Sequence, residues 1–191
     1  MARRGLDRAQ VVDAAVAIAD AEGLAAVTLA RVAAALGVRS PSLYNHVEGR
    51  DGLIRGVAAR STRELATALR RAATGRSGAD AITAVAQAQR DYARRYPGRY
   101  AATVAAPAPG DAEHEAAAAD AVDVLESVLG GAGLEGDDVI HAVRALRSAV
   151  HGFAALEASG GFALAVDPDD SFRRLVDAVA TGLGVSSPSP Q

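Results

Sequence analysis

Polar side chains suited to contacting a phosphate backbone are concentrated between residues 28 and 50, in the stretch TLARVAAALGVRSPSLYNHVEGR. The hydroxyls of Thr28 and Tyr44 can donate to phosphate oxygens, and Arg50 brings a positive charge beside them. Ser40 is expected to cap a short helix with Pro41 at its first position, which leaves N–H groups free to bind an anion. These residues predict a surface that holds duplex DNA in position.

A second set of side chains in the same stretch can read base edges. Asparagine, here Asn45, can bond adenine in bidentate fashion, and arginine, here Arg39, can do the same with guanine. Leu43 and Val47 lie four residues apart, so they share one side of the helix and can anchor it. The polar residues then point outward into a groove about 12 Å wide. They are Arg39, Ser40, Ser42, Tyr44, Asn45 and His46.

Capping signals predict the helices that position this surface. Asp7 begins a first helix and forms a capping-box pair with Gln10. Thr28 begins a second, shorter helix, which Gly37 ends. Because a capped short helix follows that glycine turn, the three elements form a helix-turn-helix.

The residues from 28 to 54, TLARVAAALGVRSPSLYNHVEGRDGLI, resemble the N-terminal domain of TetR-family regulators. The shared pattern is a threonine that opens the second helix, Gly-Val in the turn, a polar-Pro-Ser-Leu-Tyr-x-His-Val run and a basic residue four positions after the histidine. The resemblance implies that Tyr44, His46 and Arg50 contact DNA, although the family usually has lysine where Arg50 stands. The alternative is a plain αα-hairpin in which Tyr44 and His46 pack between helices.

Two basic residues, Arg3 and Arg4, precede the first helix. They resemble the arms that some relatives lay along DNA, from which they could reach phosphate or the minor groove. Short basic starts are also commonly solvated and inert. The sequence leaves both interpretations open.

Beyond residue 50 the sequence predicts helices alone, so the expected fold class is all-α. A helix over 51–73 ends at the Gly/Ser segment 74–78, which is the expected domain joint. Further helices are expected over 79–96, 112–129, 137–159 and 169–183, with a short one around 98–106. The expected domains are a three-helix DNA-binding domain over 1–56, a helical-bundle ligand-binding and dimerisation domain over 57–185, and a disordered tail over 186–191.

Composition supports a helical protein that binds DNA through its first domain. Half the residues are hydrophobic and only 4% are aromatic, which favours closely packed helices. The net charge is -3, yet residues 1–55 hold seven arginines against six acids, whereas the remainder holds thirteen against seventeen. The chain has no cysteine, which excludes disulfides and thiolate chemistry. Without a leader or a long apolar stretch, we expect a cytoplasmic protein that does not enter a membrane.

The residues from 79 to 183 carry no signature of an enzyme: no phosphate loop, no H-E-x-x-H and no Ser-His-Asp pattern. The acids of DAEHE, at 111–115, are favoured by the helix dipole, so we expect no metal and no cofactor there. A small-molecule effector is expected instead. The rings and hydroxyls of Tyr92, Tyr96 and Tyr100 can line a mostly apolar cavity, although ordinary core or surface roles suit them equally.

The helix expected over 137–159 has one face for the core and a neighbouring face formed by Ile140, Arg144, Arg147 and His151. The stretch ALRSAVHGFAALEASGGF resembles a TetR-family ligand-binding domain that carries a Trp-x-x-x-His-Gly run. Arg147 stands at the tryptophan position, and His151 with Gly152 completes the match. The resemblance makes Arg147 and His151 candidate pocket residues, although His151 suits packing or an interface at least as well.

In such relatives the last two helices pair across a twofold axis to form a homodimer. The final helix offers an apolar stripe suited to this pairing, composed of Phe172, Leu175, Val176, Val179 and Leu183. The sequence thus predicts a dimeric regulator, most simply a repressor, whose partners are double-stranded operator DNA and a small molecule that releases it. The alternative is a helical-bundle small-molecule-binding or protein-interaction module without DNA binding.

Overall fold

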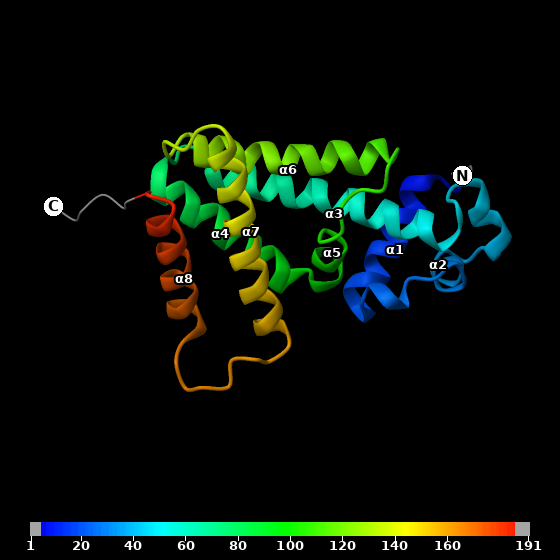
Figure 1. Ribbon diagram of the computed structural model, residues 1–191. Coiled ribbons are helices and arrows are strands. Elements are labelled where there is room, and N and C mark those ends of the chain that lie inside the picture. Colours follow the sequence, from blue (N-terminus) through cyan, green and yellow to red (C-terminus); the bar gives the residue numbers. More distant parts are fainter. Residues whose placement is uncertain (1–4, 186–191) are drawn as a thin grey trace. The chain divides into compact units, whose positions relative to one another are not determined.

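The computed structural model describes residues 5–185, so Arg3, Arg4 and the tail over 186–191 lie outside the described range. Within that range the chain forms helices and no strands, which confirms the all-α prediction (Figure 1). The helices are α1 (Arg8–Glu22), α2 (Leu29–Leu36), α3 (Gly49–Ala73), α4 (Gly78–Arg95), α5 (Pro97–Ala102), α6 (Ala112–Gly130), α7 (Asp137–Ala158) and α8 (Pro168–Gly182), with short 3-10 helices η1 (Leu24–Ala26) and η2 (Ser40–Asn45).

The chain divides into two compact units. The first contains residues 5–63 and 96–118, and the second contains residues 64–95 and 119–185. Helices α3 and α6 therefore each begin in the first unit and end in the second. This division differs from the expected domain boundary at residue 56, because α5 and the start of α6 belong with the first unit.

Local capping explains how the first unit begins its helices. The Asp7 carboxylate accepts from the backbone N–H of Gln10 at 2.8 Å, and the Gln10 side chain accepts from the backbone N–H of Asp7 at 2.9 Å. Thr28 caps α2 by accepting from the Arg31 backbone at 3.3 Å. Gly37 ends α2 in the left-handed conformation that glycine adopts without strain. The core between these helices contains Val11, Val27, Val32, Leu43, Leu53 and Val57.

Helix α5 packs closely on α1 within the first unit. A Cβ atom added at Gly98 would lie 1.8 Å from the carbonyl oxygen of Ala19, so only glycine permits this approach. Beside it, the Arg99 guanidinium donates to Asp20 through Nε at 2.6 Å, and the Arg99 backbone N–H donates to the same carboxylate at 3.2 Å. The end of α1 is thereby fixed to α5.

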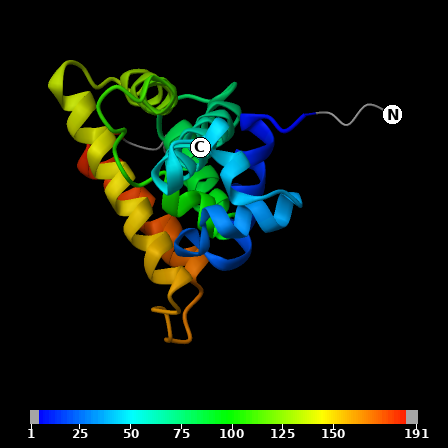
Figure 2. The same cartoon turned by 90° about the vertical axis from the view of Figure 1, so that its right-hand side faces the viewer.

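The second unit packs α4, α7 and α8 against one another. In two views at right angles, α7 and α8 lie side by side and are joined by an extended loop (Figures 1 and 2). Fully or nearly fully buried side chains from each helix form this core, among them Ile82, Val85, Leu146, Val150, Phe172 and Val176.

Candidate functional site

The segment expected to read DNA is a short 3-10 helix, η2, rather than a regular α-helix. Its N-cap is Arg39, which makes no side-chain cap bond, so the expectation that Ser40 caps this helix is wrong. Ser40 is instead its first residue, followed by Pro41. With only six residues in the helix, packing positions it: Leu43 is fully buried and Val47 is 6% exposed.

The polar residues around these two anchors face outward, as the spacing predicts. The Tyr44 side chain is 62% exposed, which does not support the alternative in which Tyr44 packs between helices. The other exposed residues are Arg39, Pro41, Ser42 and Asn45, while Ser40 and His46 are half-buried. This surface presents a phenol, an amide, a hydroxyl and a guanidinium, which together can bond both phosphates and base edges.

Arg50 lies within the first turn of α3 and not before its cap, because α3 begins at Gly49. Its Nε donates to the carbonyl oxygen of Val27 at 3.1 Å, next to the Thr28 cap of α2. One edge of the guanidinium is therefore held by the protein, and its position relative to α2 is fixed. The Thr28 hydroxyl oxygen accepts the cap bond, which leaves its O–H able to donate.

Two arginines that the sequence analysis did not single out lie beside η2. Arg8 of α1 and Arg55 of α3 line an open depression of about 370 Å³ together with Tyr44, Asn45, His46, Val47, Glu48, Gly52 and Asp111. Arg55 pairs with Glu48 at 2.7 Å and lies 3.9 Å from Asp111. The fold, and not a local motif, brings these charges together, since Arg55 and Asp111 are far apart in sequence.

The acids of the 111–115 segment form ion pairs within the first unit. Glu113 bridges α1 and α3, because it pairs with Arg8 at 2.7 Å and with Arg63 at 3.2 Å. Partial burial alone raises the pKa of Glu113, but hydrogen bonds from Arg63 and Arg8 outweigh it, and the net pKa is lowered. Across residues 5–185, no three His, Asp or Glu side chains gather as metal ligands do.

The three candidate pocket tyrosines belong to different units. Tyr92 lies in the second unit, where its side chain is buried and its hydroxyl donates to Glu64 at 3.3 Å. Tyr96 and Tyr100 lie in the first unit: the Arg99 guanidinium covers the Tyr96 ring at 4.4 Å, and Tyr100 is buried in α5. Of the other candidates, Arg147 is exposed and His151 is half-buried on α7.

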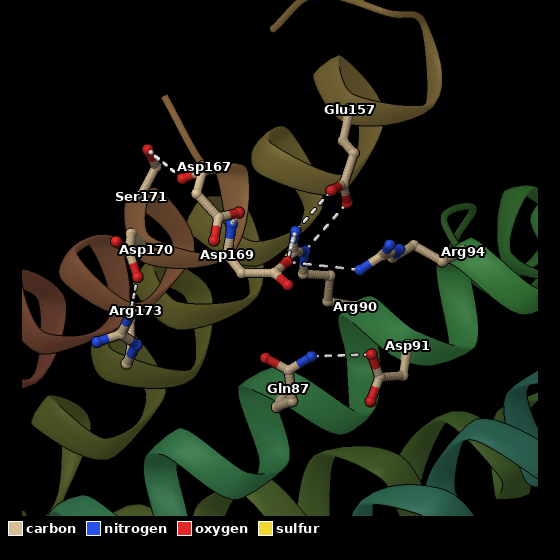
Figure 3. Close-up of polar contacts among 10 residues, drawn as sticks. All are labelled: Gln87, Arg90, Asp91, Arg94, Glu157, Asp167, Asp169, Asp170, Ser171 and Arg173. Atoms are coloured by element: carbon tan, nitrogen blue, oxygen red, sulfur yellow. Dashed lines mark hydrogen bonds and ion pairs between the residues drawn. The ribbon is translucent and has the colours of Figure 1, made fainter. Parts of the chain in front are cut away.

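A buried arginine that the sequence analysis missed joins the three helices of the second unit (Figure 3). Arg90 of α4 is 1% exposed, and it donates to both carboxylate oxygens of Glu157 on α7, at 2.5 and 3.0 Å. It also pairs with Asp169 of α8 at 2.8 Å. Hydrogen bonding to Glu157 raises the pKa of Arg90 despite the opposing effect of burial. The guanidinium lies over the rings of Phe153 and Phe172, at 5.1 and 4.7 Å.

The apolar stripe of α8 is divided between the core and the surface. Phe172 and Val176 are each 2% exposed within one chain, so they are unavailable to a partner. Leu175, Val179 and Leu183 are half-buried. No helix between residues 5 and 185 has the length and apolar character needed to cross a membrane.

Comparison with known proteins adds sequence patterns to this geometry. Residues 11–57 match the family described as bacterial regulatory proteins, tetR family, and residues 82–179 match the family described as tetracyclin repressor-like, C-terminal domain. The chain is 37% identical over 179 residues to an uncharacterized HTH-type transcriptional regulator of Mycobacterium tuberculosis, an alignment that covers 93% of this chain and 82% of that protein.

Two further comparisons agree with these matches. An uncharacterized HTH-type transcriptional regulator of Bacillus subtilis is 33% identical over 186 residues, which cover 97% of this chain and 96% of that protein. Among solved structures, a TetR variant from Acinetobacter baumannii in complex with minocycline aligns with a TM-score of 0.72 and 21% identity, covering 96% of this chain and all of that one. The likeness to this structure concerns the fold.

Proposed function

Because the chain belongs to the tetR family of bacterial regulatory proteins, we propose that this DNA-binding transcriptional regulator is a dimeric repressor that a small molecule releases from its operator. Its DNA is the bacterial chromosome, so its place of action is the cytoplasm. The observation that carries the proposal is the outward presentation of Ser42, Tyr44 and Asn45 above buried Leu43, inside the segment that matches the family.

The side chains of this surface have two separate tasks. Tyr44, Thr28 and Arg50 hold phosphates, since they offer hydroxyl and guanidinium donors at the edges of η2 and α2. Asn45, Ser42 and Arg39 read bases, because they are exposed on the short element that enters the major groove. His46 and Ser40 are half-buried and help to orient that element.

The effector binds in the second unit, away from the DNA-binding surface. Buried Tyr92 and half-buried His151 place aromatic and polar groups among apolar helices of that unit, which suits a mostly apolar ligand with a few polar handles. The A. baumannii relative was solved with minocycline, so this fold can hold a small molecule. Arg147 is a weaker candidate than the two residues above, because it is exposed.

The deciding experiment is selection of bound duplexes from a random library with the purified full chain, followed by competition with a panel of metabolites. We expect a palindromic consensus, salt-dependent affinity and at least one compound that releases the duplex. A chain that enriches no duplex and shows no salt-dependent binding would be the ligand-binding or protein-interaction bundle without DNA binding. A compound that releases DNA by binding residues 5–55 would contradict the effector site in the second unit.

A further inference from the structure

The outer face of α7 carries a continuous ridge of five residues, each four positions after the last. Residues four apart are neighbours on a helix surface, so they form one row along it. Ile140 is 37% exposed and Leu156 is 54% exposed, whereas Leu146 and Val150, on the opposite side of the helix, are buried. The ridge consists of Ile140, Arg144, Ser148, Gly152 and Leu156.

Gly152 has no steric reason to be glycine within a single chain. A Cβ atom added there meets no heavy atom within 4 Å, whereas one added at Gly98 or Gly56 collides with Ala19 or Val12. Glycine in a helix interior costs about 1 kcal/mol relative to alanine. A helix that approaches α7 from outside the chain would require this glycine, and it would offset that cost.

The ridge is complementary to itself about its central residue. If two copies of α7 run antiparallel with Ser148 of each on a twofold axis, Ile140 of one copy lies beside Leu156 of the other. In the same arrangement Arg144 lies beside Gly152, where the missing side chain leaves room for the arginine stem. A twofold interface demands such reciprocal contacts, because residue i meets j wherever j meets i.

Charge does not oppose this arrangement. Arg144 is four residues from the axis, so the two copies of it are separated by eight residues, or about 12 Å, along the helices. This separation exceeds the screening length of about 8 Å at physiological ionic strength. The two apolar contacts at the ends of the ridge are therefore not balanced by a close pair of like charges at its centre.

We propose that α7 is the core of the dimer interface and pairs antiparallel with α7 of a second copy, with Ser148 at the twofold axis. Rows of residues four apart that interdigitate cross at about −50°. The half-buried Leu175 and Val179 of α8 would lie beside this contact and not at its centre. The inference rests on the proposed dimer and gives it a register.

Cross-linking tests the register directly, because the chain contains no cysteine. Oxidation of Ser148→Cys should give a covalent dimer on a non-reducing gel, since residues on the axis come within the Cα–Cα limit of about 7 Å. Ile140→Cys alone should stay uncross-linked, and Ile140→Cys combined with Leu156→Cys should cross-link. A Ser148→Cys protein that sediments as a dimer and does not cross-link would overturn the register while leaving the repressor proposal intact.

A steric variant tests the close approach. Gly152→Leu points into open space within one chain and improves helix propensity, so each chain should remain folded by circular dichroism. Its dimer dissociation constant in sedimentation equilibrium should rise at least about tenfold. Gly130→Leu, at another open helical glycine, is the matched control and should not change it.

The stripe on α8 provides the competing outcome. If Leu175→Glu with Val179→Glu yields monomers while Gly152→Leu dimerises as the parent does, then α8 forms the centre of the interface and the assignment to α7 is wrong. A parent chain that is monomeric at every concentration would overturn the register and the dimeric repressor together, which distinguishes the two failures.

Discussion

Asn45 and Arg50 lie five positions apart, yet the structure gives their side chains different surroundings. Asn45 is exposed at the last position of η2, where its amide can face a base. Arg50 is tied through Nε to the Val27 carbonyl at the junction of α2 and α3. A residue that reads sequence must reach into the groove, and a residue that holds the backbone must be fixed beside it.

Replacing the exposed amide should reduce discrimination while the phosphates are held as before. Asn45→Ala is expected to weaken binding to the selected duplex by about 1 to 3 kcal/mol for each base that the amide recognises. Affinity for a scrambled duplex and the salt dependence should stay close to parental values. Fluorescence anisotropy on both duplexes across a salt series measures this, and unchanged discrimination would remove Asn45 from the base-reading set.

Replacing the tethered guanidinium should weaken binding to every duplex alike. Arg50→Ala is expected to flatten the log-log salt dependence by about 0.9 for each phosphate that Arg50 neutralises. Arg71→Ala is the matched control, because Arg71 is exposed at the end of α3 in the second unit. A parental slope for Arg50→Ala would show that this arginine serves the α2–α3 junction and not the phosphate.

At the scale of elements, local signals predicted what local interactions decide. Asp7, Thr28 and Gly37 act through their nearest neighbours, and each performs the predicted capping role. The 3-10 geometry of η2 was not predicted, because burial of Leu43 and Val47 positions a six-residue segment whose capping signal at Ser40 is unused. Periodicity located α8, but it could not tell which half of its apolar stripe the chain itself covers.

The contact of α5 with α1 depends on one glycine that no motif identified. Gly98→Ala places a Cβ atom against the Ala19 backbone, which cannot move aside as a side chain could. We expect overpacking to lower stability by about 1 to 3 kcal/mol, or roughly 2 to 4 °C in Tm per kcal/mol for a chain of this size. Thermal unfolding followed by circular dichroism measures the decrease. Gly130→Ala should be neutral or stabilising, because its site is open, and equal effects of the two changes would contradict the close packing.

At the scale of the whole molecule, ion pairs between distant residues were beyond sequence reasoning. Arg8 meets Glu113 across 105 positions, and Arg90 meets Glu157 across 67. Composition revealed only that acids exceed arginines in the later part of the chain. The structure shows that two of these acids neutralise buried Arg90, and that Glu113 neutralises Arg8 and Arg63 of the first unit. Net charge therefore describes the DNA-binding surface less well than the pairing of each arginine does.

Thermodynamic linkage gives a test of regulation that involves the whole molecule. If an effector held by the second unit weakens duplex affinity about 30-fold, saturating duplex must weaken effector affinity about 30-fold, a coupling of about 2 kcal/mol. Calorimetric titration of the releasing compound, with and without the selected duplex, measures this reciprocal factor. In allosteric coupling the factor reaches a plateau as duplex concentration rises, because both ligands can be bound together. A compound that competes at the DNA surface would show an apparent affinity that keeps falling in proportion to duplex, and that result would exclude regulation through the second unit.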